Sequence, residues 1–192
     1  MANRNFINDD FLLTNQTSRN LYHEYAAKMP IIDYHCHLPP EEIADDKTWS
    51  TITEVWLDGD HYKWRAMRSN GVDENYVTGD ASHWDRFSNW AETMPKLIGN
   101  PLYHWNQLEL ARYFNVFDLL GPSSAEKIYS QCNELLGEEG LSSRKLIKQS
   151  NVKVICTTDD PCDTLEHHEK INTDSTIECK VIPAWRPDKA MM

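Results

Sequence analysis

The chain lacks the features that anchor a protein in a membrane or brace a secreted domain with disulfides. No apolar run approaches the roughly 18 residues of a membrane span, and no charged segment followed by an apolar stretch opens the chain. The five cysteines are odd in number and form no C-x-x-C pair, so neither a disulfide framework nor a zinc ribbon is indicated. These absences favour a soluble cytoplasmic protein with reduced thiols and no membrane partner.

Positive charge is also scarce. Nineteen lysines and arginines stand against thirty aspartates and glutamates, which gives a formal net charge of −11. Such a balance repels the phosphates of nucleic acids, so we expect no nucleic-acid partner. With 192 residues, the chain is long enough for one domain with a sizeable core.

Short segments rich in β-branched and apolar residues alternate with helical patterns, which is typical of an α/β fold. Strands are expected over residues 31–37, 152–158 and 177–183, with helices over residues 17–28 and 163–172. Between the first two strands the apolar residues recur at helical spacing. Helices are expected there over residues 51–57, 60–69, 82–97, 101–114, 124–136 and 142–149.

Each expected strand has polar residues at its C-terminal end, where a barrel of parallel strands builds its active site. An eight-stranded barrel typically takes about 250 residues, and only three strands are expected here. Residues 1–40 would form the N-terminal helix and first strand, 41–150 a large α-helical insert after that strand, and 151–192 the second and third strands. The three segments would make a single incomplete barrel domain.

Two histidines at the end of the first strand are the leading candidates for chemistry. His35 and His37 lie two residues apart, so their side chains share one face of the strand and could converge on one metal ion. Asp33 lies on the same face and could be a ligand or could orient a neighbour by hydrogen bonding. Cys36 alternates to the other face, which makes it a poor ligand. An isolated H-x-H pair is weak evidence for metal binding, and it would supply only part of the ligands of a metal site.

Five segments, one of which contains the pair, carry a resemblance to a known family. They are Pro30–Leu38, which contains the pair itself, then Gly59–Arg68, Asn100–Trp105, Cys156–Pro161 and Pro183–Lys189. Together and in this order they resemble the uronate isomerases, also called glucuronate isomerases, of the amidohydrolase-like metal-dependent barrels. The resemblance runs from about Phe11 to the last residue and implies that the chain is the N-terminal part of a (β/α)8 TIM-like barrel.

The resemblance implies an aldose–ketose isomerase that interconverts D-glucuronate with D-fructuronate and D-galacturonate with D-tagaturonate. It implies that His35 and His37 bind a divalent metal, commonly zinc, although manganese, iron or cobalt suit two histidines as well. Tyr62 matches an active-site tyrosine that contacts substrate and can relay a proton. Arg186 matches an arginine that contacts substrate. The expected partner is a small uronate sugar, and a homo-oligomer stays open.

Arg186 also has a physical case of its own. A planar guanidinium binds a carboxylate through two parallel hydrogen bonds, and an acidic chain needs such a local cation to hold an anionic sugar. The alternative is a structural ion pair with Asp188 or Asp160.

Other polar residues have simpler structural explanations. Without the resemblance, Tyr62 would be expected to pack with Trp64 and Met67 in a helix, and Arg65 is a weaker candidate for a substrate contact. The segment from Thr157 to Asp160 is expected to form a strand-end turn. His167 and His168 are expected on an exposed helix face.

The resemblance places the catalytic base on an aspartate of the last barrel strand, beyond Met192. We therefore expect the 192-residue chain alone to be inactive and prone to aggregation, because three strands leave parallel edges uncovered. Two rival hypotheses are a metal-dependent hydrolase of the amidohydrolase group, which also begins with H-x-H, and a non-catalytic helical interaction module.

Overall fold

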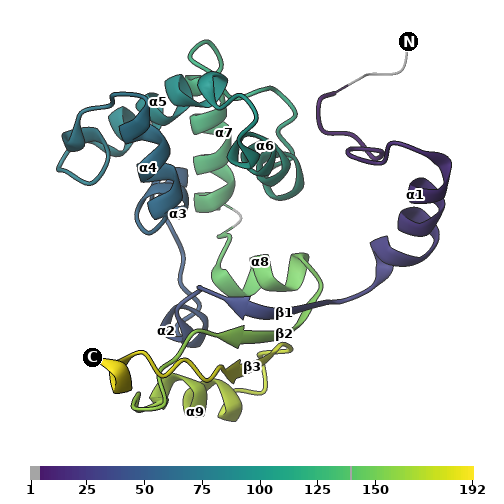
Figure 1. Ribbon diagram of the computed structural model, residues 1–192, viewed down its shortest axis with the longest axis vertical. Coiled ribbons are helices and arrows are strands. Elements are labelled where there is room, and N and C mark those ends of the chain that lie inside the picture. The colour runs from purple at the N-terminus through teal and green to yellow at the C-terminus, as the bar shows by residue number, and fades with distance from the viewer. Residues whose placement is uncertain (1–4, 139) are drawn as a thin grey trace. The chain divides into compact units, whose positions relative to one another are not determined.

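The computed structural model describes residues 5–138 and 140–192, which fall into two compact units (Figure 1). The helical unit contains the described residues up to Leu12 and from Trp49 to Gly140. The sheet unit contains residues 13–48 and 141–192. Each unit is built from segments that are far apart in the sequence.

The sheet unit contains three parallel strands, as the sequence predicts. They are β1 (Ile31–Cys36), β2 (Val152–Thr157) and β3 (Lys180–Pro183), in the order β1-β2-β3. Ile32 lies opposite Val154 across the first pair of strands, and Ile155 lies opposite Val181 across the second. Because the strands are parallel, their C-terminal ends lie at one edge of the sheet.

Four α-helices belong to this unit: α1 (Gln16–Asn20), α2 (Pro40–Ala44), α8 (Ser143–Gln149) and α9 (Glu166–Thr173). Residues 21–28 continue α1 as short π-helical and 3-10 turns, so the predicted helix over residues 17–28 is helical throughout. The core of the unit joins Ile155 and Val181 of the strands to Ile171 of α9 and Ile43 of α2. Helices therefore cover one face of the sheet.

The opposite side of β1 stays open among the described residues. Ile32 and Tyr34 are exposed to 64% and 83%. Large apolar side chains in such positions are uncommon on a finished sheet surface.

The helical unit contains α3 (Ile52–Leu57), α4 (His61–Ser69), α5 (His83–Thr93), α6 (Pro101–Phe114) and α7 (Ala125–Glu138). A side chain caps the N-terminus of α3, α4, α5 and α6, from Thr51, Asp60, Ser82 and Asn100 respectively. The apolar faces bury Trp56, Met67, Phe87, Trp90 and Leu110, so packing in this unit does not depend on a sheet.

The individual helices predicted between the first two strands are thus present, within one or two residues of their expected starts. That they form an insert in a barrel, with boundaries at residues 41 and 150, stays a prediction. Within the described residues, no helix is both long enough and apolar enough to cross a membrane.

Candidate metal and substrate site

His35 and His37 converge at the C-terminal end of β1. Their rings lie 4.9 Å apart between centroids, and the two Nε2 atoms are 3.1 Å apart. Both residues are exposed. The Asp33 Oδ1 atom accepts a hydrogen bond of 3.2 Å from the main-chain N–H of His35, which holds this carboxylate against the strand. This contact is with the main chain and does not itself orient either imidazole ring.

The two Nε2 atoms fit a shared metal ion. The 3.1 Å between the two Nε2 atoms is short enough for both to bind one metal ion. Without an ion, one ring can donate to the other instead. Among residues 5–138 and 140–192, no group of three or more histidine, cysteine, aspartate or glutamate side chains is arranged to hold a metal. A metal ion held by His35 and His37 would therefore need further ligands besides the described residues.

Arg186 follows β3 and is held at the same edge of the sheet. Its main-chain N–H donates to the Asp159 carbonyl oxygen at 3.2 Å, and its Nε donates to Asp188 Oδ2 at 2.8 Å. The alternative of an ion pair with Asp188 is thus present, between side chains that are both about half exposed. That contact engages Nε, and a carboxylate can be bound by the two terminal guanidinium nitrogens.

Tyr62 lies in the first turn of α4, in the helical unit, whereas His35, His37 and Arg186 belong to the sheet unit. Its ring is 58% exposed, so it does not pack into the core with Met67, which is fully buried. The Asp60 Oδ1 atom accepts from the Tyr62 main-chain N–H at 2.9 Å and caps the helix.

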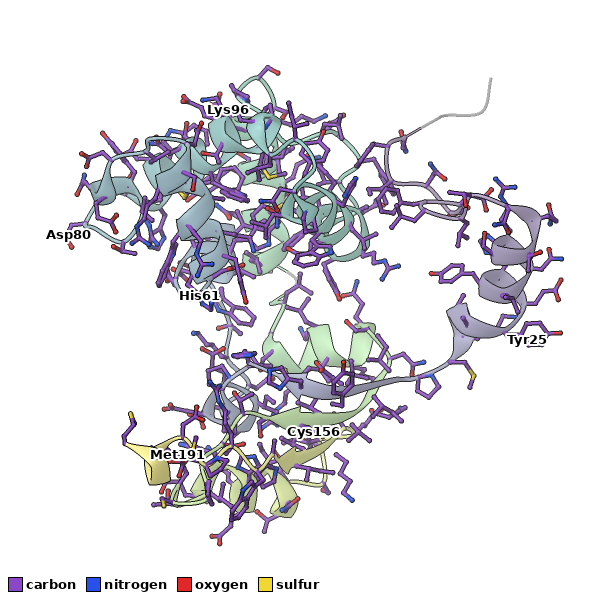
Figure 2. The ribbon with its side chains drawn as sticks, in the orientation of Figure 1. Tyr25, His61, Asp80, Lys96, Cys156 and Met191 are labelled. Atoms are coloured by element: carbon purple, nitrogen blue, oxygen red, sulfur yellow. The ribbon has the colours of Figure 1, made fainter. Side chains whose placement is uncertain are left out.

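Two neighbours flank the Tyr62 ring. The ring of His61 lies 4.4 Å from it between centroids, and the guanidinium carbon of Arg65 lies 5.6 Å from its centroid. Figure 2 labels His61 at the start of α4. The Tyr62 ring thus lies close to both an imidazole and a guanidinium, and the latter contact is a cation–π interaction.

Two polar residues at the end of β2 and one on α9 are buried together, a cluster that the sequence did not predict. Thr157, Asp159 and His168 are all buried, with exposed fractions of 0%, 7% and 4%. The expectation that His168 is exposed is therefore wrong. His168 lies three residues before the buried Ile171 on α9, and this helical spacing was the signal that could have revealed it.

Asp160 follows directly and forms the strand-end turn that the sequence predicts. Its carboxylate accepts from the main-chain N–H groups of Cys162 at 2.9 Å and Lys189 at 2.8 Å. These hydrogen bonds hold the pKa of the Asp160 carboxyl below its usual value. The turn after β2 is thereby tied to the segment after β3.

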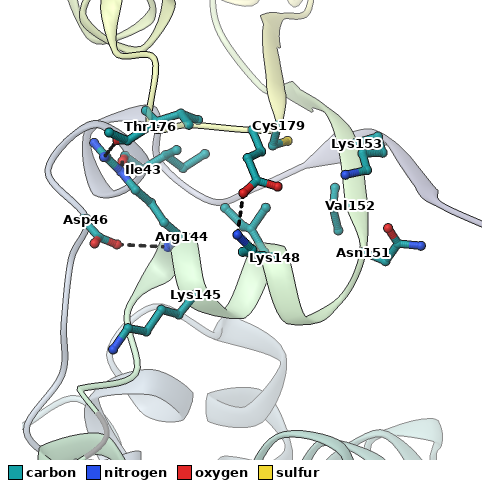
Figure 3. Close-up of a pocket in the computed structure, with 13 residues that line it drawn as sticks. Ile43, Asp46, Arg144, Lys145, Lys148, Asn151, Val152, Lys153, Thr176 and Cys179 are labelled. Atoms are coloured by element: carbon teal, nitrogen blue, oxygen red, sulfur yellow. Dashed lines mark hydrogen bonds and ion pairs between the residues drawn. The ribbon is translucent and has the colours of Figure 1, made fainter.

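A separate cavity of about 260 Å³ lies where β2 and β3 begin, at the end of the strands away from the candidate site (Figure 3). Arg144 dominates its polar wall. The guanidinium donates to the carbonyl oxygens of Ile43 at 2.7 Å and Ala44 at 2.6 Å and to the Asp174 carboxylate at 2.9 Å. Lys148 pairs with Glu178 beside it. Since the donors of Arg144 are engaged by groups of the protein itself, we interpret Arg144 as a structural residue and the cavity as unlike a ligand site.

The chain is similar to several known proteins over nearly its whole length. A family model described as glucuronate isomerase matches residues 3–192. The uronate isomerase of Lachnoclostridium phytofermentans is 60% identical over 97% of the chain, and that of Lachnospira eligens is 57% identical over 98%. The crystal structure of uronate isomerase from Thermotoga maritima superposes with a TM-score of 0.91 at 39% identity and covers 97% of the chain.

The match covers nearly all of this chain but only part of each relative. The chain spans about 40% of the length of each of these three proteins. Since the family model covers nearly the whole chain, the resemblance seen in the sequence motifs is confirmed: the chain belongs to the glucuronate isomerase family.

Proposed function

We propose that this chain provides the metal-binding and carboxylate-binding part of a uronate isomerase, which interconverts D-glucuronate with D-fructuronate and D-galacturonate with D-tagaturonate. The observation that carries the proposal is the convergence of His35 and His37 at the end of β1, in a chain that belongs to the glucuronate isomerase family. Moving a proton between C2 and C1 of the sugar requires a base, a group that polarises the oxygens, and a fixed substrate.

In this proposal Arg186 holds the carboxylate of the uronate and Tyr62 contacts the substrate and relays a proton. His35 and His37 would hold a divalent ion, taken here to be zinc, which when bound polarises substrate oxygens. The catalytic base comes from outside residues 1–192. The guanidinium of Arg186 supports its role because its fork matches a carboxylate, and the exposure of Tyr62 leaves its hydroxyl accessible.

The proposal extends to the fold. The three parallel strands would begin an eight-stranded barrel, and residues 41–150 would be a helical insert between its first two strands, flanked by segments 1–40 and 151–192. The open side of β1, with Ile32 and Tyr34 exposed, supports this because the interior of a barrel is filled by side chains from all its strands.

The five cysteines are free thiols, which suits the reducing conditions of the cytoplasm, where we place the enzyme. Its partner is the small uronate sugar, and neither nucleic acid nor a membrane surface is expected to attract a chain of charge −11.

A chimeric enzyme tests the function. In this chimera, residues 1–192 replace the matching 40% of the Lachnoclostridium phytofermentans uronate isomerase, and the unmodified parent is the control. The chimera should isomerise D-glucuronate, and His35→Ala should abolish the reaction. A folded chimera that hydrolyses esters or lactones but leaves uronates unchanged would instead support the amidohydrolase-type alternative.

A further inference from the structure

Three polar side chains are buried together at the C-terminal end of β2. Thr157 Oγ1 lies 2.5 Å from Asp159 Oδ2 and 2.8 Å from His168 Nε2, and none of the three residues is more than 7% exposed. Buried polar groups lower the stability of a fold unless they are hydrogen-bonded. A hydroxyl, a carboxylate and an imidazole at one strand end therefore require an explanation beyond packing.

The protons in this network can be assigned. The Asp159 carboxylate only accepts, so the single Thr157 hydroxyl proton points to Asp159 Oδ2 at the shorter distance. The hydroxyl oxygen must then accept from His168, which places a proton on Nε2. His168 on α9 thus donates to Thr157 at the end of β2, and Thr157 donates to the Asp159 carboxylate. Each hydrogen bond fixes the orientation of the next group.

The Asp159 main chain then contacts the segment after β3. The Asp159 carbonyl oxygen accepts from the main-chain N–H of Arg186 at 3.2 Å, and the Thr157 carbonyl oxygen accepts from the Ala184 N–H at 2.9 Å. Three residues further on, the Lys189 N–H donates to the Asp160 carboxylate at 2.8 Å. The stretch that carries Arg186 is thus attached to the turn after β2 on both sides of that residue.

We propose that Thr157, Asp159 and His168 are positioning residues for Arg186, which hold its guanidinium where the substrate carboxylate binds. The inference rests on the proposed function of Arg186. The Arg186 side chain is half exposed and pairs with Asp188, two residues along the same segment, so the position of both depends on the main chain of that segment. If Thr157 loses its hydroxyl, the Asp159 carboxylate loses a hydrogen bond. The Asp159 carbonyl oxygen, which accepts from the Arg186 main-chain N–H, is then held less firmly.

The test uses the chimera and three substitutions. Thr157→Val removes the hydroxyl and keeps the shape of the side chain, whereas Thr157→Ser keeps the hydroxyl. Thr53→Val is the matched control, because Thr53 is also fully buried and its hydroxyl donates to the His83 carbonyl oxygen at 2.7 Å within the helical unit. The measurements are KM and kcat for D-glucuronate, with hydrogen–deuterium exchange of residues 184–189.

Thr157→Val should raise KM about tenfold or more, because small displacements of a binding group have large effects. The value of kcat should change by less than about threefold, because the carboxylate is bound equally in the ground and transition states. Exchange at residues 184–189 should become faster. Thr157→Ser should keep KM, kcat and the exchange of residues 184–189 at their wild-type values. Thr53→Val should leave KM unchanged even if it lowers the thermal stability.

A double substitution shows whether the network acts through Arg186. In an Arg186→Ala background, Thr157→Val should change KM by less than about twofold, because the group it positions is gone. Additive effects on KM would overturn the inference, and so would an unchanged KM in folded Thr157→Val. If Thr157→Val does not fold, His168→Leu and His168→Gln are judged by the same criteria, because glutamine keeps an N–H donor toward Thr157 and leucine does not.

Failure of the proposed function has a different result. In that case the chimera with the unsubstituted segment would not isomerise uronates although its parent does. Normal turnover combined with an unchanged KM in the Thr157 variants would refute the positioning network alone.

Discussion

Replacing Arg144 by methionine should loosen the sheet unit around the N-terminal ends of β2 and β3. Arg144 donates to two main-chain carbonyl oxygens, those of Ile43 and Ala44, and to the side chains of Asp174 and Thr176. It therefore ties α8 both to the end of α2 and to the turn before β3. Methionine keeps an unbranched side chain of similar helix propensity and removes every donor.

The magnitude follows from the two carbonyl contacts. Hydrogen bonds from a charged donor contribute about 1.5 kcal/mol each at the low end of their range, so the two together contribute about 3 kcal/mol. Since a factor of ten corresponds to about 1.4 kcal/mol, the opening equilibrium of this region should rise about a hundredfold. The hydrogen bond to the Asp174 carboxylate adds to this free energy, so the rise in the opening equilibrium should be at least this large.

Hydrogen–deuterium exchange of the chimera measures the change region by region. Peptides that cover residues 40–46 and 174–178 should exchange faster in Arg144→Met. The control is Lys148→Met on the same helix, because Lys148 pairs with Glu178 between two exposed side chains and such pairs contribute little. Equal effects of the two substitutions, or an Arg144→Met variant that exchanges like the wild type, would refute the reasoning.

Three further predictions concern activity and pH. The purified 192-residue chain alone should show no glucuronate turnover and should scatter light or bind a hydrophobic dye, and turnover that disappears in His35→Ala would contradict this. Arg186→Lys in the chimera should raise KM for D-glucuronate about tenfold, because lysine loses the bidentate geometry, and an unchanged KM would argue against carboxylate binding. The lowered pKa of Asp160 contributes stability that is present above about pH 4, the unfolded value, and is lost as pH falls through the folded value. Exchange of residues 184–189 should therefore depend less on pH between 5 and 3 in Asp160→Asn, and a profile like that of the wild type would exclude this role.

Local sequence signals predicted most of the elements. The β-branched run from Val152 gave β2, and capping residues such as Thr51 and Asp60 marked helix starts because they satisfy the first main-chain N–H groups. β3 begins three residues later than predicted. Asp174 and Thr176 form a side-chain turn there, in which Asp174 Oδ1 accepts from the Thr176 N–H at 2.9 Å, and this turn delays the strand.

The candidate site was predicted only in part, for a physical reason. His35 and His37 are two residues apart at the end of β1, so their proximity is a local feature that the sequence can predict. The link between Asp159 and Arg186 joins two turns that follow different strands, through main-chain atoms that every residue possesses. No residue type marks such a contact, so it appears only when the register of β2 and β3 is known.

The His35 and His37 pair is the centre of the proposed function, and metal content tests it most directly. The chimera, its His35→Ala and His37→Ala variants and the unmodified parent would be dialysed against zinc and analysed for bound metal, with glucuronate turnover measured before and after removal by a chelator. We predict about one zinc per chain in the chimera, loss of zinc and turnover in both variants, and recovery of turnover when zinc is returned to the chelated chimera. Stoichiometric zinc and full turnover in both histidine variants would contradict the proposal.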